Sequence, residues 1–151
     1  MIEQLHVKKV AVIQPAAIVD NASWTVVTID RKGWDHVSID CLLGAADIAV
    51  AALKVQESDA SGSGFADVTG LVYGTSNNDT GSASTLPSAT DDNLLFGFSI
   101  DCRGRKRYLK LVATGGDGAA GSYLAAIATL CRGAQGSLTA AEAGYSQRLV
   151  V

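Results

Sequence analysis

Apolar and polar residues alternate with a period of two in several segments of this chain. Almost no segment repeats with the period of 3.6 residues that marks an amphipathic helix. The clearest example is residues 36–43, in which Val37, Ile39, Cys41 and Leu43 alternate with His36, Ser38, Asp40 and Leu42. Such alternation is typical of a strand with one buried face. The pattern therefore predicts an all-β protein.

The other strand candidates are separated by stretches rich in Gly, Ser and Asp, which favour turns. They cover residues 7–14, 23–30, 48–57, 65–73, 94–102, 106–114 and 122–132, and Pro15 is expected to end the first. The last candidate is ambiguous because its alanines suit a helix, but its position after seven β-like segments favours a strand. Residues 74–93 are a long polar stretch, in which we expect a functional or interface loop with room for a short edge strand.

Seven or eight short strands joined by such turns predict an antiparallel β-sandwich of jelly-roll type. A chain of 151 residues is long enough to bury a core as one domain. We expect the sandwich over residues 21–132, with an N-terminal strand or arm over residues 1–20 and a C-terminal tail over residues 133–151. Simple fraying is one interpretation of both ends.

Charge and cysteine usage narrow the classes of function. The net charge of −3 gives no overall reason to bind nucleic acid, and no apolar run is long enough to span a membrane. Residues 1–9 lack the uninterrupted apolar region that a signal peptide needs. A reducing cytoplasm is therefore the expected site of synthesis and folding. Cys41, Cys102 and Cys131 lack the paired spacing of metal ligands, so we expect three buried, reduced thiols and no metal.

No arrangement of residues in the sequence predicts an enzyme or a cofactor. Neither His6 nor His36 stands at metal-ligand spacing, and only a Cys–His pair formed by folding is left open. Residues 116–121 match the glycine pattern of dinucleotide-binding loops, but residues 133–141, which lead to the acidic Glu142, contain no strand candidate. A β-hairpin turn is favoured instead, with Asp117 and Gly118 supplying the positive φ angles.

A basic cluster is the candidate contact site. Arg103, Arg105, Lys106 and Arg107 are four of the twelve basic residues and lie between two strand candidates. One interpretation is a hairpin turn at Gly104 with solvated charges. The other is a docking surface whose arginines bind carboxylates of a partner protein.

The two tryptophans, Trp24 and Trp34, also have two interpretations. Core anchors are the more typical role, whereas an exposed ring beside polar groups would indicate a carbohydrate-binding platform.

Four motifs in a fixed order connect the chain to a family. They are Ile29-Asp30-Arg31-Lys32-Gly33-Trp34-Asp35, Leu53-Lys54-Val55-Gln56-Glu57-Ser58-Asp59, Phe65-Ala66-Asp67-Val68 and Arg103-Gly104-Arg105-Lys106-Arg107-Tyr108-Leu109. In these motifs the chain resembles the head decoration, or cement, proteins of tailed bacteriophages, over roughly residues 24–131.

The resemblance implies a β-sandwich that sits on the exterior of an icosahedral capsid and stabilises it. It implies the major capsid protein and further copies of the chain as partners, most often in homotrimers. The basic cluster would then contact the capsid. Residues 1–20 and 133–151 would be candidates for strand exchange or for lying on neighbouring subunits. The alternatives are a carbohydrate- or host-surface-binding module on the virion, and a head-completion or tail component.

Overall fold

The computed structural model describes residues 7–18, 20–133 and 141–147. Within these residues the chain forms eight strands and no helix, so the predicted all-β fold is confirmed. The strands are β1 (Lys8–Ile18), β2 (Ile29–Asp30), β3 (Trp34–Ala46), β4 (Ala52–Ser58), β5 (Ala66–Val72), β6 (Leu95–Asp101), β7 (Tyr108–Thr114) and β8 (Ser122–Gly133). The ambiguous segment near residue 127 is thus a strand, as its position in the chain favours.

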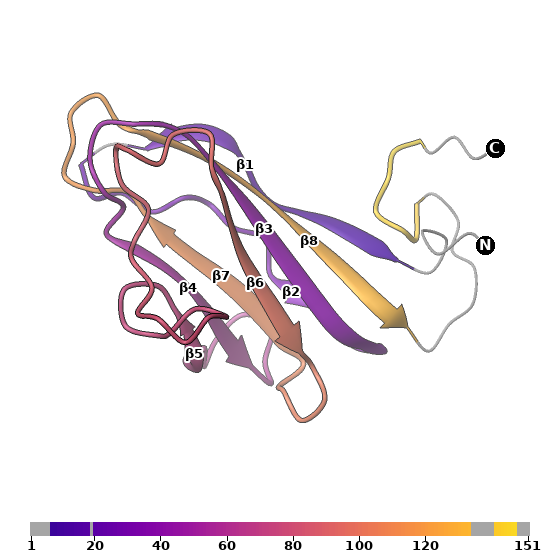
Figure 1. The fold of residues 1–151 in the computed structure, drawn as a ribbon. Helices are drawn as coiled ribbons and strands as arrows, with labels where there is room; N and C mark the ends of the chain where they lie inside the picture. The colour runs from indigo at the N-terminus through magenta and orange to yellow at the C-terminus, as the bar shows by residue number, and fades with distance from the viewer. Residues whose placement is uncertain (1–6, 19, 134–140, 148–151) are drawn as a thin grey trace.

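The strands form two antiparallel sheets of four, which pack as two layers (Figure 1). We call them sheet A, in the order β1-β8-β3-β6, and sheet B, in the order β2-β7-β4-β5. The pairing is nested: β4 pairs with β5, β3 with β6, β2 with β7 and β1 with β8. As a result, the first and last strands, β1 and β8, lie side by side in sheet A.

The core lies between the two sheets and follows from the alternation in the sequence. The inward side chains of β3 (Val37, Ile39, Cys41 and Leu43) are completely buried. Leu109 and Leu111 of β7 face them from sheet B and are also completely buried. Since successive side chains of a strand point to opposite faces, the intervening residues lie on the outer faces of the sandwich.

Two predicted strand limits are wrong. β1 continues past Pro15 to Ile18, because it is an edge strand whose register shifts at Ala11/Ile13 and Ile13/Ala16, and proline is tolerated at such positions. In residues 23–30 only Ile29–Asp30 is a strand, joined by an isolated bridge from Ser23 to Thr114. The rest of that segment forms part of the connection from β1 of sheet A to β2 of sheet B.

The two predicted hairpin turns are also not hairpins. The basic turn joins β6 of sheet A to β7 of sheet B, and residues 115–121 join β7 back to β8 of sheet A. Each strand makes its hydrogen bonds with a partner distant in the chain. In the second turn, Gly121 has the positive φ of 84°, whereas Asp117 and Gly118 do not.

The long polar stretch before β6 contains no regular strand. An isolated bridge from Asn77 to Ala83 closes a compact loop. Further along the stretch, the Asp91 carboxylate accepts hydrogen bonds from the Ser88 amide and hydroxyl. The stretch is therefore a loop with an ordered hydrogen-bonding pattern, as its composition predicts.

The N-terminal strand and part of the C-terminal tail pack together. The Lys9 amide donates to the Ala143 carbonyl oxygen at 2.7 Å, and Ala143 is completely buried. Gly144 follows with a φ of 84°, directly against the Lys9 backbone, where a Cβ would overlap the Lys9 carbonyl. Residues 141–147 therefore cover the start of β1. The remaining parts of the predicted arm and tail lie outside the described residues.

Trp24 is a core residue and gives a direct test of the packing. Its indole Nε1 donates to the Ala16 carbonyl oxygen at 2.9 Å, and the side chain is 4% exposed. Trp24→Ala is expected to lower the free energy of unfolding by about 3–5 kcal/mol, because it leaves a large cavity. Trp24→Phe keeps much of the packing and loses the hydrogen bond, for a loss of about 1–3 kcal/mol. Urea unfolding followed by fluorescence of Trp34 measures both variants, and equal stability of Trp24→Ala and the native chain would contradict the assigned packing.

Candidate interaction surface

The predicted contact cluster is a turn whose charges are paired within the chain. Arg103 binds Asp101 through two guanidinium nitrogens, the shorter contact being 2.6 Å. Arg107 binds Asp30 in the same two-pronged way, at 2.7 and 3.0 Å. Arg105 lies 3.4 Å from Glu57.

Lys106 lies 3.9 Å from Asp59, and its amide donates to Glu57. All four predicted contact residues therefore lie together, each with a carboxylate of its own chain beside it.

The backbone of this turn is also held from within. Gly104 has a φ of 80°, a conformation that few other residues adopt without strain. Arg31 reaches across from the end of β2 and donates to the carbonyl oxygens of Arg105 and Lys106. The predicted contact surface therefore has a structural role. Five side chains hold the turn that connects the two sheets: Arg31, Asp30, Glu57, Asp59 and Asp101.

The electrostatics of the turn agree with this role. The hydrogen bond from Arg103 holds the pKa of Asp101 well below its ordinary value, and Arg107 lowers the pKa of Asp30 in the same way. Because both carboxylates stay ionised, the cations are neutralised on the protein itself. A partner carboxylate would have to compete with these pairs.

The glycine-rich loop before β8 has its amides occupied as well. The Asp47 carboxylate accepts hydrogen bonds from the amides of Ala120, at 2.8 Å, and Gly121, at 3.1 Å. A strand follows this loop, whereas a dinucleotide-binding loop opens a helix. In a dinucleotide-binding loop such amides would bind a phosphate, whereas here they bind Asp47 and join this loop to the loop after β3.

Neither tryptophan forms a platform on the surface. Trp24 is 4% exposed and Trp34 is 9% exposed, so both are core anchors. The alternative, a carbohydrate site built on an exposed tryptophan ring, is wrong for these two residues.

An apolar patch on the outer face of sheet A is a stronger candidate. It consists of Leu42 of β3, Leu95 of β6, and Tyr123 and Ile127 of β8, which are 47%, 72%, 50% and 48% exposed. Leu42 is the direct cross-strand partner of Leu95 on one side and of Ala125 on the other. Gly44 lacks a side chain beside Tyr123, and a Cβ there would lie 2.9 Å from the tyrosine Cβ. The patch therefore spans three strands through Leu42, with the exposed Asp40 opposite Ile127 at its margin.

The outer face of sheet B is different. Lys54 of β4 forms a 2.8 Å ion pair with Asp67 of β5, which also accepts from Gln56. Lys110 of β7 lies over the Phe65 ring. Among the described residues, no large apolar side chain of sheet B is as exposed as those of the patch. Polar side chains suit a face in contact with water, whereas a clustered apolar face marks an interaction site.

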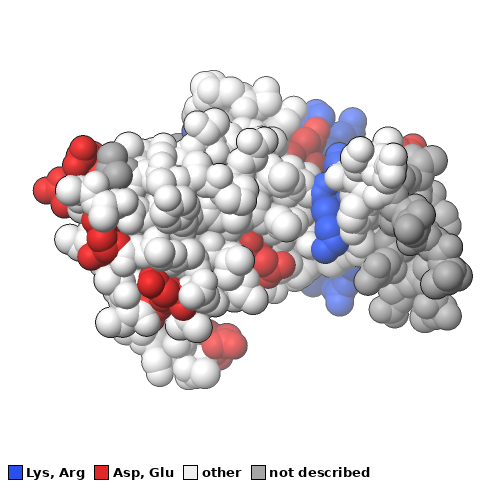
Figure 2. Space-filling view, turned by 90° about the horizontal axis from the view of Figure 1, so that it is seen from above, with Lys and Arg blue, Asp and Glu red and all other residues white. Residues whose placement is uncertain are grey.

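Charge is distributed unevenly along the molecule, with acidic side chains at one end and basic side chains towards the other (Figure 2). The acidic end contains the loops that meet where β3 ends and β8 begins. Segments 20–24, 46–52, 86–95 and 114–123 contribute five aspartates there and contain no lysine or arginine; the aspartates are Asp20, Asp47, Asp91, Asp92 and Asp117. The patch adjoins this end, since the Asp92 carboxylate accepts from the Ala46 amide at the end of β3.

One cysteine differs from the prediction of three buried thiols. Cys41 and Cys102 are buried, and burial raises the pKa of the Cys41 thiol to about 12. Cys131 is half-exposed, because its side chain lies on the outer face of β8 beside His36 of β3. Its sulfur lies 3.3 Å from the His36 Nδ1, and the Nε2 of the same ring lies 3.0 Å from the Ser99 hydroxyl. The sequence gives no sign of this contact, since the two residues are 95 positions apart.

Among the described residues, no three His, Cys, Asp or Glu side chains are placed to hold a metal ion. The described part of the chain also has no helix with the length and apolarity needed to cross a membrane. His6 lies outside the described residues.

No family model, curated protein or solved structure matches the chain. The resemblance to phage decoration proteins therefore remains a prediction from the four sequence motifs, and the surface must be interpreted from its own chemistry.

The cysteines give a test of this surface. Brief treatment of the folded protein with iodoacetamide is expected to alkylate Cys131 and to leave Cys41 and Cys102 unmodified, since only Cys131 is accessible. Mass spectrometry of tryptic peptides identifies the modified residue, and unfolding in urea should make all three react. Equal native reactivity of Cys41 and Cys131 would contradict the orientation of β3 and β8.

Proposed function

We propose that this chain is a structural protein of a tailed-phage virion, made in the host cytoplasm, that decorates the outside of the icosahedral capsid and stabilises it. Its action is contact between proteins rather than catalysis, with no cofactor, nucleic acid or membrane as a partner. The observation that carries the proposal is the apolar patch on sheet A, beside a sheet B whose outer face is polar. The resemblance of the four sequence motifs supplies the identity of the assembly.

The energetics of the patch favour a protein partner. Full burial of one leucine side chain is worth about 1.5–3 kcal/mol, so covering Leu42 and Leu95 would contribute several kcal/mol to binding. This contribution is obtained at every copy of a repeated lattice, where many modest contacts add up. Since the patch adjoins the acidic end, the matching surface is expected to be apolar with lysine or arginine at its rim.

The strand pairing supports the jelly-roll part of the prediction. Nested pairs from β4–β5 outward to β1–β8 are the pattern of one long hairpin wrapped into two sheets. Jelly rolls of this kind are common among virus capsid domains. The fold alone does not determine function, so this similarity adds to the argument from the patch without replacing it.

We propose the major capsid protein and other copies of this chain, in a homotrimer, as the partners. The patch is the principal contact, and the basic turn at Arg103–Arg107 is first a structural element. Arg103 is expected to contribute least to docking, because Asp101 on its own chain already binds its guanidinium at two positions.

The test compares variants for binding to purified shells that lack the chain. Leu42→Ser combined with Leu95→Ser is expected to weaken binding at least about tenfold, because two apolar contacts are lost. Val27→Ser is the control, since Val27 is about as exposed as Leu42 (52% against 47%) but lies outside sheet A. Arg103→Gln is expected to retain binding.

Sedimentation with shells followed by gel quantification measures occupancy, and the melting temperature of each variant checks that it is folded. Native occupancy by the double leucine variant would contradict the role of the patch. Failure of the native chain to bind shells would contradict the decoration function itself.

A further inference from the structure

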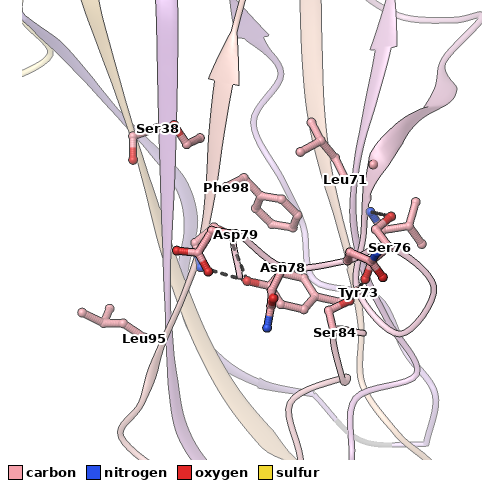
Figure 3. Close-up of a pocket in the computed structure, with 14 residues that line it drawn as sticks. Ser38, Leu71, Tyr73, Ser76, Asn78, Asp79, Ser84, Leu95 and Phe98 are labelled. Atoms are coloured by element: carbon pink, nitrogen blue, oxygen red, sulfur yellow. Dashed lines mark hydrogen bonds between the residues drawn. The ribbon is translucent and has the colours of Figure 1, made fainter. Parts of the chain in front are cut away.

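A second feature of the surface is a cleft of about 670 Å³ beside the edge strand β6 (Figure 3). One wall comes from sheet A, through Ser38 of β3 and residues 95–99 of β6. The other comes from the end of β5 and the loop that follows it, at residues 70–79 and Ser84. The cleft thus lies where the open edges of the two sheets meet, a position at which polar backbone and side-chain groups remain accessible.

Gly97 lines the cleft without a side chain. Its neighbours on the same face of β6, Leu95 and Ser99, carry side chains, and both line the cleft. A Cβ built at Gly97 would lie 3.7 Å from the Ile39 carbonyl oxygen and 3.9 Å from Asp40, which are ordinary contact distances. The backbone would therefore accept a side chain at this position, and with glycine the space is available to a ligand.

Tyr73 is fixed in place at the centre of the cleft. Its hydroxyl donates to the Gly97 carbonyl oxygen at 3.0 Å and lies 3.2 Å from the Gly97 amide, which donates to it. Its ring packs edge-to-face on Phe98, at 5.2 Å between centroids, and on Phe96, at 5.8 Å. Burial is the main cause that raises the pKa of Tyr73, with the Asp79 carboxylate adding to it, so the hydroxyl stays neutral. A side chain held in this way requires no ordering by a ligand.

The loop after β5 presents oriented polar groups. The Asn78 Oδ1 accepts hydrogen bonds from the Thr80 amide, the Thr80 hydroxyl and the Ser82 amide, at 2.7–3.1 Å. This fixes the side chain and leaves its NH₂ group as the available donor. Asp79 follows, and its carboxylate makes no hydrogen bond or ion pair with the rest of the described chain. One free donor group and one free acceptor group are therefore adjacent.

The chemistry of the lining selects a class of ligand. It combines a carboxylate, an amide and hydroxyls with the apolar side chains of Leu71, Leu95 and Phe98, and it contains no lysine, arginine or histidine. An anion would find no counter-charge there, and a purely apolar molecule would leave the polar groups without partners. A sugar ring offers both an apolar face of C–H groups and a rim of hydroxyls that donate and accept.

We propose that this cleft binds a neutral carbohydrate. Adjacent hydroxyls of one sugar ring donate to the Asp79 carboxylate and accept from the Asn78 NH₂ group, while the C–H face of the ring packs on the apolar wall. The test of this site does not depend on the capsid proposal, because it requires only the folded chain, although Leu95 belongs to both the cleft and the apolar patch. It also differs from the tryptophan site considered above, since neither Trp24 nor Trp34 lines the cleft.

The experiment is a titration of the ¹⁵N-labelled protein with neutral sugars, followed by amide chemical shifts. The probes are glucose, galactose, mannose and N-acetylglucosamine and a linear oligosaccharide of each, at millimolar concentration. With at least one probe, shift changes are expected to be confined to residues 71–79 and 95–99.

Two variants and a control locate the site. Asp79→Asn, which keeps the shape and removes the charge, is expected to weaken binding at least about tenfold. Gly97→Val is expected to abolish binding by filling the cleft, with little change in melting temperature because the backbone has room for a side chain. Asp117→Asn makes the same change of charge at an exposed residue outside the cleft and should bind like the native chain.

Several results would overturn the proposal. They are the absence of shift changes with every probe, shift changes mapped to another face, and native affinity in both Asp79→Asn and folded Gly97→Val. Tighter binding of glucuronate than of glucose would also overturn it, because an uncompensated carboxylate at Asp79 should repel an acidic sugar. Since no capsid is present in the titration, its failure leaves the decoration proposal intact.

Discussion

The pairing of β8 with β3 is the interaction on which the rest of the structure depends. It places a strand from the end of the described chain in the middle of sheet A, between β1 and β3. Ten residues of β3 have a partner in β8, from Trp34 to Ala46. Closing so long a loop costs conformational entropy. Burial of apolar surface by the inward side chains of both strands offsets this cost.

The same pairing determines what the outer face shows. With Leu42 fixed between Leu95 and Ala125, the outward residues of three strands form one surface instead of separate exposed side chains. A shift of β8 by one residue would turn Tyr123 and Ile127 towards the core and expose Ala128, removing the β8 part of the patch. The patch is thus a consequence of the register that builds the core.

The sequence predicted the fold class because alternation depends on local chemistry, and a strand with one buried face leaves a period of two. It could not predict which strands pair, since the partners of β6 and β7 lie far along the chain. For that reason the basic turn and the glycine-rich turn were predicted as hairpins, although each joins the two sheets. Asp30, Glu57 and Asp59 reach the basic turn only through tertiary structure, so their pairing with Arg107, Arg105 and Lys106 could not be predicted, whereas Asp101 is two positions from Arg103 in the sequence.

The candidate surface had a partial signal. Leu42 stands at an outward position in an alternating segment, where His36, Ser38 and Asp40 are polar, and an apolar residue in that phase indicates exposure. Leu95 has the same signal against the inward phase of Phe98 and Ile100. The contact of Cys131 with His36, and the cleft around Gly97, had no such signal, because they depend on the register of β3 with its two neighbours.

The most direct test of the central claim is the number of copies of this chain per copy of the major capsid protein in purified virions. Quantitative mass spectrometry with labelled peptides of both proteins measures this ratio. A decoration protein in a symmetric lattice is predicted to approach one copy per capsid subunit. A few copies per particle would contradict decoration and indicate a head-completion or tail component, and absence of the chain from virions would contradict a structural role.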